Sequence, residues 1–307
     1  MHDDTHHIRV PEELAHSLTR FFGPAWTRAL PGLAQHQLRR WNLRPAAPPL
    51  HGAVSLVIPV HRADGRQAML KVLPIDDESE GEPHALRTWA GDGAVRLLQH
   101  DPTNGAMLLE ALDPTRNLNT LEIDQALTTI GLLLSRLTSH PAPHGMRDLE
   151  TITHTLVQRA QHLTPRLRSA HERDQLTNLA AHAHDMAPEA GNQLLHWDLH
   201  FENVLAPLPG TDREPWLAID PKPLAGDPGF DLLPILHNRW EETLATGDPH
   251  RETRRRLDLV SEAAGIPRDR AHAWTLVRTL QECVWRIEDG TTTLPDVPMT
   301  ITEALTR

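Results

Sequence analysis

The chain has 307 residues, of which 39% are hydrophobic and 23% are charged, as in ordinary soluble globular proteins. Its formal net charge of −11 argues against general nucleic-acid binding, and it fits either a cationic partner or a solvated acidic surface. The sequence has no secretion signal and no apolar run of about 18 residues, so we expect a cytoplasmic protein without a membrane span.

The first third of the chain predicts two β-hairpins with one helix between them, preceded by a helical segment. The helical pattern covers 11–40, with a break expected at Pro31–Gly32, and a second helix is expected at 82–90. The strands predicted from β-branched and apolar residues between turn signals are 53–60, 67–73, 95–100 and 106–111.

The remainder of the chain predicts mainly helices, interrupted by three short strands. The expected helices are 121–138, 149–163, 176–186 and 268–288, and the expected strands are 193–195, 204–206 and 216–219. The fold class is therefore α+β. We predict a sheet-containing domain at 1–112 and a helical domain at 113–307, with a ligand cleft between them.

The densest polar chemistry lies in residues 196–206, which read HWDLHFENVLA. Asp198 and Asn203 lie five positions apart there, and Asp220 follows an apolar strand 17 residues after Asn203. Phosphoryl transfer from a nucleotide uses one carboxylate to align the attacking hydroxyl and accept its proton. It also uses an Asn and a second carboxylate to hold Mg²⁺, which prefers oxygen ligands. The alternative is that these residues only satisfy local turns.

Only two of the 30 basic Lys and Arg residues are lysines, Lys71 and Lys222. The ammonium group of lysine is a point charge, whereas the guanidinium of arginine is a planar group with several N–H donors. A lysine kept in so arginine-rich a chain therefore marks a candidate site. Lys71 would contact the α/β-phosphates and be held by a helix acid. Glu82 is the preferred partner, with Glu78 and Glu80 as alternatives, and a surface lysine on an edge strand is the other interpretation of Lys71.

Three segments together resemble the aminoglycoside phosphotransferases: HWDLHFENVLA, WLAIDPKPLAGDPGFDLLP and GDGAVRLLQHD. Within that family the resemblance is to the aminoglycoside/hydroxyurea resistance kinase branch, and it covers nearly the whole chain. It implies a bilobal protein-kinase-like fold, with a small antiparallel-sheet N-lobe and a larger, mainly helical C-lobe. It also implies transfer of the γ-phosphate of ATP, with Mg²⁺, to a hydroxyl of a cationic antibiotic. The 6-hydroxyl of streptomycin is the expected acceptor, and hydroxyurea or another small alcohol is the alternative.

The resemblance also implies roles by position. The catalytic base is Asp198, the metal ligands are Asn203 and Asp220, the phosphate-anchoring pair is Lys71 with Glu82, and the adenine-binding hinge is 109–112, with Glu110 and Leu112. No glycine-rich loop precedes Lys71, where HGAVS stands instead, so Ser55 becomes a candidate phosphate contact. The Asp-Phe-Gly motif of protein kinases is replaced by Asp220-Pro221, and no Ala-Pro-Glu motif follows it. Both differences agree with a small-molecule acceptor rather than a protein.

A cationic acceptor calls for carboxylates and aromatic faces. Glu282, Trp285 and Asp289 recur at intervals of three and four, so they are expected on one helix face, unless Trp285 simply packs into the core beside solvated acids. His200 and Glu202 are further candidate substrate contacts, with a solvated loop as the alternative.

Three neighbours of the motif have roles outside catalysis or roles that stay open. His196 is expected to hold the loop by hydrogen bonds rather than to act as a base. Asp231 opens an apolar helical run, so we expect it to cap a helix or brace a loop. Lys222 either contacts phosphate or braces the loop, and the sequence does not decide between the two.

Two rival functions remain at this point. A metal-dependent hydrolase would use the alternating His196, Asp198 and His200, but it leaves Lys71 unexplained. A non-catalytic nucleotide-binding protein would not need the complete set of two acids and an Asn. Neither interpretation, nor the kinase one, calls for an obligate protein partner.

Overall fold

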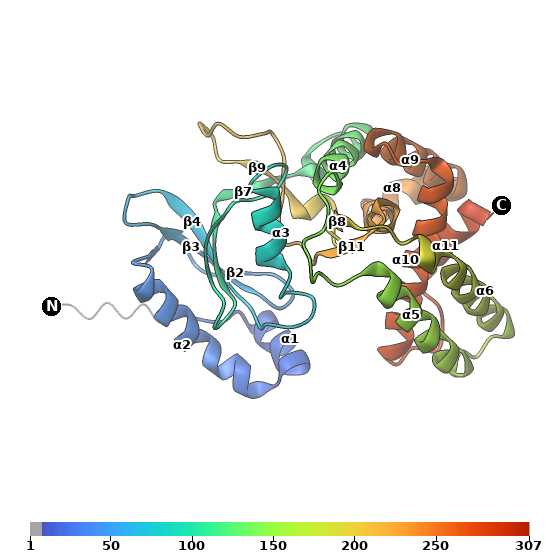
Figure 1. Cartoon of the computed structure of the whole chain (residues 1–307), viewed down its shortest axis with the longest axis horizontal. Coiled ribbons are helices and arrows are strands. Elements are labelled where there is room, and N and C mark those ends of the chain that lie inside the picture. Colours follow the sequence, from blue (N-terminus) through green and yellow to red (C-terminus); the bar gives the residue numbers. More distant parts are fainter. Residues whose placement is uncertain (1–7, 307) are drawn as a thin grey trace. The chain divides into compact units, whose positions relative to one another are not determined.

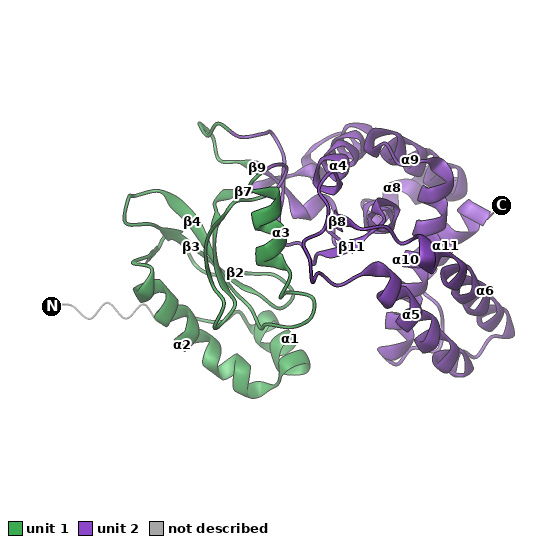
Figure 2. Cartoon of the chain, in the orientation of Figure 1, with its two compact units in different colours: residues 1–91, 95–112, 207–212 green, residues 92–94, 113–206, 213–307 purple. Residues whose placement is uncertain are grey.

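The computed structural model describes residues 8–306. The chain divides into two compact units, drawn in different colours in Figure 2. Unit 1 comprises 1–91, 95–112 and 207–212, and unit 2 comprises 92–94, 113–206 and 213–307. The predicted division after residue 112 has the same main boundary, but it lacks the two short exchanged segments, 92–94 and 207–212.

Unit 1 contains a six-stranded antiparallel sheet with helices against it, and Figure 1 labels its three helices and the strands β2, β3 and β4. Its helices are α1 (Glu12–Phe22), α2 (Pro24–Arg40) and α3 (Glu82–Trp89). Its strands are β1 (Arg44–Pro45), β2 (Leu50–His51), β3 (Leu56–His61), β4 (Gln67–Val72), β5 (Leu97–Asp101) and β6 (Ala106–Glu110). The order is β1-β3-β4-β6-β5, and β2 pairs with β3.

The alternation of side chains along β4 explains where Lys71 lies. Leu70 and Val72 belong to the buried cluster that joins the sheet to α1 and α2. Because successive side chains of a strand point to opposite faces, Lys71 points to the other face. Glu82, at the start of α3, contacts it there.

The predicted helix break at Pro31–Gly32 is wrong, since both residues lie inside α2. The chain breaks instead at Gly23, whose φ of +82° is a left-handed conformation that glycine adopts without strain. Leu30 and Ala34, on either side of Pro31, are fully buried in the core of unit 1. Tertiary packing of this face therefore outweighs the local cost of proline.

Unit 2 is built mainly from helices. They are α4 (Ile123–Thr138), α5 (Leu149–Leu163), α6 (Ala170–Met186), α7 (Leu232–His237), α8 (Trp240–Ala245), α9 (Pro249–Ala264), α10 (Arg268–Glu288) and α11 (Asp296–Thr306). The strands are β7 (Leu112–Asn117), β8 (Gln193–Leu195), β9 (Val204–Pro207), β10 (Leu217–Ala218) and β11 (Leu224–Gly226). They form a three-stranded sheet, β10-β9-β7, and a pair, β11-β8.

The core of unit 2 surrounds α10, which packs against α5, α6 and α11. Its fully buried side chains include Trp274, Val277 and Leu280, and the same buried face carries the polar residues Arg278 and Gln281. On the other side of the unit, α4 and α9 lie against each other (Figure 1). Within residues 8–306, none of the helices combines the length and the apolar character that a membrane span needs.

Candidate active site

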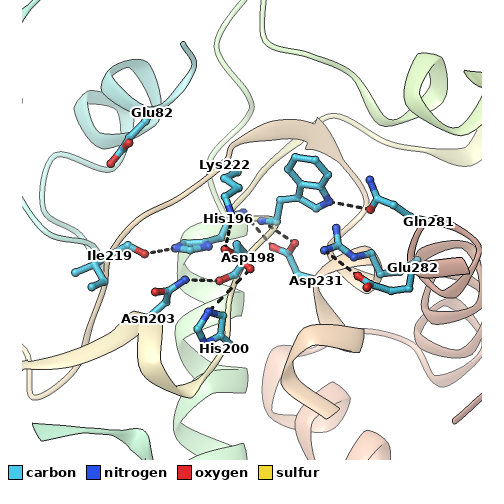
Figure 3. Close-up of polar contacts among 12 residues, drawn as sticks. Glu82, His196, Asp198, His200, Asn203, Ile219, Lys222, Asp231, Gln281 and Glu282 are labelled. Carbon is cyan, nitrogen blue, oxygen red and sulfur yellow. Dashed lines mark hydrogen bonds and ion pairs between the residues drawn. The ribbon is translucent and has the colours of Figure 1, made fainter. Parts of the chain in front are cut away.

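The loop between β8 and β9, residues 196–203, carries the polar motif, and a buried carboxylate holds its first residues. Asp231 accepts hydrogen bonds from the backbone N–H of His196 at 3.0 Å and of Trp197 at 2.8 Å (Figure 3). Burial raises the pKa of Asp231 to about 7, against the lowering effect of these N–H groups and of Arg278. The expected loop-bracing role is confirmed, and Asp231 makes no side-chain cap of α7.

Trp197 has a φ of +67°, a strained conformation for a residue with a large side chain. Its indole N–H donates to Oε1 of Gln281 at 3.2 Å. The guanidinium groups of Arg147 and Arg278 lie 4.6 and 5.2 Å from the ring centroid. The surrounding side chains therefore hold Trp197 in this conformation and fix the start of the loop.

Asp198 follows directly and forms an ion pair with the second lysine of the chain. The Nζ of Lys222 donates to Oδ2 of Asp198 at 2.6 Å, whereas Nε2 of His200 lies 4.0 Å from Oδ1 (Figure 3). Burial raises the pKa of Asp198, but the charge and hydrogen bond of Lys222 outweigh it, so the net pKa lies below its ordinary value. The carboxylate is therefore ionised and able to accept a hydrogen bond from a hydroxyl group.

Asn203 lies directly before β9, Asp220 lies two residues after β10, and a backbone hydrogen bond connects the two segments. The N–H of Ile219 donates to the carbonyl of Asn203 at 2.9 Å, and Asp220 is the next residue, with a φ of +57°. The side-chain Nδ2 of Asn203 donates to the carbonyl of Asp198 at 2.9 Å, which leaves its Oδ1 as the atom for a ligand. An amide oxygen and a carboxylate are oxygen ligands of the kind that Mg²⁺ takes.

Mg²⁺ in phosphoryl-transfer sites is held by one or two carboxylates together with the phosphates of the substrate, so the protein supplies few ligands. Among residues 8–306, no group of three or more His, Cys, Asp or Glu side chains is arranged to hold a metal ion. A site built from Asn203 and Asp220 fits Mg²⁺ bound with a nucleotide, and it does not fit a zinc site of the hydrolase type.

His196 is fully buried, and its Nε2–H donates to the carbonyl of Ile219 at 3.0 Å. Burial lowers its pKa to about 4, so the ring is neutral at physiological pH. The structure therefore supports the expected loop-holding role.

In unit 1, Lys71 and Glu82 form a buried ion pair, with exposed fractions of 3% and 1%. The Nζ of Lys71 donates to both carboxylate oxygens of Glu82 at 2.7 Å. Glu82, rather than Glu78 or Glu80, is thus the partner. Glu78 lies in a turn organised by Asp76, whose Oδ1 accepts from the N–H of Glu78 at 3.2 Å.

The other predicted nucleotide contacts lie in unit 1 as well. Ser55 is buried just before β3, and its carbonyl accepts from the N–H of Gly52 at 2.9 Å. Glu110 ends β6, and its Oε2 accepts from the N–H of Arg96 at 3.1 Å. Leu112 is buried at the start of β7. Their contacts with a nucleotide stay predictions.

The structure brings two of the three predicted α10 residues close to the loop. Trp285 has its ring centroid 6.0 Å from that of Trp197, and it also packs against the core. Glu282 forms an ion pair with Arg278 at 3.6 Å, and burial and the charge of Asp198 raise its pKa. Asp289 is exposed and directly follows the last residue of α10.

The two loop candidates for the acceptor differ in exposure. His200 is partly buried beside Asp198, whereas Glu202 is exposed in the short 3₁₀ turn Phe201–Asn203. Sequence reasoning missed the contacts of Gln281 and Arg278 with the loop, because only their place on a helical face was visible. It marked Lys222 as unusual without finding its partner.

Comparison with known proteins identifies the family of the chain. The family model described as aminoglycoside/hydroxyurea antibiotic resistance kinase matches residues 40–290. A hydroxyurea phosphotransferase of Kitasatospora aureofaciens is 46% identical over 97% of this chain and 86% of its own length. A streptomycin 6-kinase of Streptomyces glaucescens is 44% identical over 97% of both chains.

The fold is shared with solved structures of much lower identity. A macrolide 2′-phosphotransferase of Brachybacterium faecium superposes with a TM-score of 0.56 at 13% identity, over 91% of this chain and 98% of that one. This likeness concerns the fold alone, and it confirms the predicted α+β, protein-kinase-like class. With the family match over most of its length, the chain belongs to the aminoglycoside/hydroxyurea antibiotic resistance kinases.

Proposed function

We propose that this chain transfers the γ-phosphoryl group of ATP to the 6-hydroxyl of streptomycin and so inactivates a cationic antibiotic. One observation carries the proposal: an ionised Asp198 lies in a braced loop, the side chain of Asn203 donates a hydrogen bond to the backbone carbonyl of Asp198, and Asp220 follows the paired strand. This is the set of groups that phosphoryl transfer from a nucleotide needs.

Asp198 would orient the acceptor hydroxyl and take its proton. The hydroxyl oxygen forms a bond to the γ-phosphorus, the bond from that phosphorus to the β,γ-bridging oxygen breaks, and ADP leaves. Positioning of the two reactants supplies most of the rate enhancement in such reactions. The hydrogen bonds from His196 and Trp197 to Asp231 support this role, because they fix the backbone that carries Asp198.

Asn203 and Asp220 would hold Mg²⁺ through their side-chain oxygens. When bound, the ion neutralises negative charge on the transferred phosphoryl group. Lys71 in unit 1 would contact the α/β-phosphates, and Glu82 holds its ammonium group in place at 2.7 Å. Ser55, Glu110 and Leu112 are the further proposed nucleotide contacts.

The acceptor is expected to carry positive charge, because acids gather at the loop. Asp198 and Glu282 are close enough for the charge of Asp198 to raise the pKa of Glu282. Lys222 already lies beside Asp198 and Arg278 beside Glu282, and the guanidino groups of streptomycin would add further cations next to the two carboxylates. Trp285 lies three residues after Glu282 on α10, and His200 and Glu202 lie within four residues of Asp198.

Hydroxyurea is the second candidate acceptor, because a hydroxyurea phosphotransferase is 46% identical to the chain. It is uncharged, so it would not use the negative charge of Glu282. Streptomycin is favoured for this reason, and the chain also covers 97% of the streptomycin 6-kinase against 86% of the hydroxyurea enzyme. Because ATP is the proposed donor, we also predict that the chain acts in the cytoplasm, without an obligate protein partner.

The test is ADP release by the purified chain with ATP and Mg²⁺, in the presence of streptomycin, of hydroxyurea or of neither, followed by mass analysis of the acceptor. We expect streptomycin-dependent ADP and one added phosphate on streptomycin. ADP and phosphate transfer with hydroxyurea alone would replace streptomycin as the acceptor. Failure to bind ATP would overturn the kinase assignment of the loop.

A further inference from the structure

We propose that Lys222 is a positioning residue for phosphoryl transfer: it holds Asp198 through Oδ2 and leaves Oδ1 for the acceptor hydroxyl. The inference rests on the proposed function, in which Asp198 orients that hydroxyl. Sequence position alone did not assign a role to Lys222, and no part of the phosphoryl-transfer scheme above uses it.

The two oxygens of the Asp198 carboxylate have different surroundings. Oδ2 accepts a short, charge-assisted hydrogen bond of 2.6 Å from Nζ of Lys222. Oδ1 lies 4.0 Å from Nε2 of His200, which is beyond hydrogen-bond distance. A carboxylate held at one oxygen cannot rotate freely about its Cβ–Cγ bond, so the direction of the other oxygen is fixed.

The backbone of Lys222 is tied to the same loop that carries Asp198. Its N–H donates to the carbonyl of His196 at 3.0 Å, and its carbonyl accepts from Nη2 of Arg147 at 3.2 Å. The guanidinium of Arg147 also lies over the ring of Trp197. The ammonium and the carboxylate are therefore mounted on one hydrogen-bonded frame, which suits a fixed orientation of Asp198.

The choice of lysine supports the same role in a chain with 30 Lys and Arg residues and only two lysines. An ammonium group binds a single carboxylate oxygen as a point charge. A guanidinium binds both oxygens in a planar fork and would occupy Oδ1 as well. A positioning role therefore requires lysine, whereas a role in charge balance would accept arginine.

We expect unit 2 to stay folded without this ion pair. The side chains of Lys222 and Asp198 are 35% and 26% exposed, and partly exposed ion pairs contribute little to stability. Arg159 and Glu288 form a matched ion pair in the same unit, with side chains 38% and 37% exposed. This second pair supplies a control for loss of an ion pair without an effect on Asp198.

The first experiment compares Lys222→Met and Lys222→Arg with the control Arg159→Met in the full chain. We expect both Lys222 variants to lose about 100-fold in kcat, the size of effect that a small misplacement of a catalytic group produces. The KM values for ATP and for the acceptor should change much less, since the lost interaction acts on the transition state. Arg159→Met should retain the kcat of the unmodified chain, with an unfolding temperature similar to that of Lys222→Met.

The second experiment restores the ammonium group chemically. In Lys222→Cys, the thiolate displaces bromide from 2-bromoethylamine and forms an S–C bond, which gives a side chain of the length and charge of lysine. The chain has one natural cysteine, Cys283, which is fully buried and whose pKa is raised by burial, so it should not react. We expect the treated variant to regain most of its kcat, while treatment leaves the unmodified chain unchanged.

The outcomes separate this inference from the proposed function. If the unmodified chain transfers phosphate to neither acceptor, the proposed function fails. If it does transfer phosphate, then an active Lys222→Met, a fully active Lys222→Arg or a treated Lys222→Cys without recovery overturns the positioning role.

Discussion

The carboxylate of Asp231 accepts a hydrogen bond of 2.8 Å from the backbone N–H of Trp197, which lies 34 residues earlier in the chain. A second hydrogen bond of 3.0 Å comes from the N–H of His196. The residue that follows Trp197 is Asp198, so a fully buried acid far away in sequence sets the backbone of the proposed catalytic residue. Substitutions at Asp231 should therefore alter both stability and turnover.

The stability of the protein should depend on pH through Asp231. Burial raises its pKa from the ordinary 3.8 to about 7, so the folded state binds more protons than the unfolded state between these values. Its stabilising contribution is therefore complete below pH 3.8 and is lost as the pH rises towards 7, by up to about 1.4 kcal/mol per pH unit. Asp231→Asn should remove this slope.

The measurement is the free energy of unfolding by denaturant between pH 4 and 7, for the unmodified chain and for Asp231→Asn. His237 acts in the opposite direction, because burial lowers its pKa to about 4 and its contribution is lost as the pH falls below 6.5. It is present in both proteins, so the difference between them isolates Asp231. If the free energy of unfolding had the same pH dependence in both proteins, the raised pKa of Asp231 would be contradicted.

Asp198→Ala should reduce turnover by about 10²–10⁴-fold, because the acceptor hydroxyl loses the group that orients it and takes its proton. Binding of ATP should survive, because the proposed nucleotide contacts lie elsewhere in the chain. ADP release measures the first effect, and nucleotide titration measures the second. Near-normal turnover would remove Asp198 from the mechanism.

Replacing only one partner of the Lys71–Glu82 ion pair should strongly destabilise the protein. Glu82→Leu leaves a buried ammonium without its carboxylate partner, and we expect a loss of about 3–5 kcal/mol in the free energy of unfolding. Lys71→Met combined with Glu82→Leu should recover most of that loss but remain inactive. Denaturant unfolding and ADP release would be compared for the two single variants and the double variant. Additive losses would mean that the two side chains do not depend on each other.

Glu282→Gln should raise the KM for streptomycin about tenfold, since a hydrogen bond to a charged partner is weakened, and leave the KM for ATP unchanged. Glu288→Gln, on the same helix but exposed and paired with Arg159, is the control. If hydroxyurea is also an acceptor, its KM should not respond to either change. An unchanged KM for streptomycin would place its cations elsewhere.

Gly131 should not tolerate alanine, although alanine favours helices. A Cβ at Gly131 in α4 would lie 2.7 Å from both the carbonyl oxygen of Val260 and the Cβ of Ala263 in α9. We expect Gly131→Ala to destabilise the protein by about 1–3 kcal/mol. Gly32→Ala is the matched control in α2: apart from its chain neighbours and the backbone of its own helix, no atom lies within 4 Å of its added Cβ, so it should gain about 0.5–1 kcal/mol. The test is the free energy of unfolding by denaturant, measured for both variants and for the unmodified chain.

The sequence was sufficient for features that depend on local pattern. The period of apolar residues predicted α10 with its observed bounds, and the start of α3 singled out Glu82 among three nearby acids. Strands β1 and β2 have two residues each, and so short a strand carries no period of its own. For this reason β1 and β2 were not predicted.

The rest of the site depends on the path of the chain between distant segments. Lys222 and Asp198 are 24 residues apart, and their contact requires the turn at Asp220 with its positive φ. The strained φ of Trp197 is likewise a result of tertiary contacts, since Gln281, 84 residues away, accepts from its indole. Local preferences of tryptophan favour a different backbone conformation.

The scarcity of lysine has a practical consequence for handling the protein. Apart from the α-amino group, the chain offers two amines, and the side chain of Lys71 is 4% exposed while that of Lys222 is 35% exposed. Of the two lysines, Lys222 beside Asp198 is therefore the one that amine-reactive dyes, cross-linkers and sensor-chip chemistries should modify. Immobilisation through a fused tag avoids modification of Lys222. Conversely, acylation of Lys222 would report how accessible the loop is to reagents.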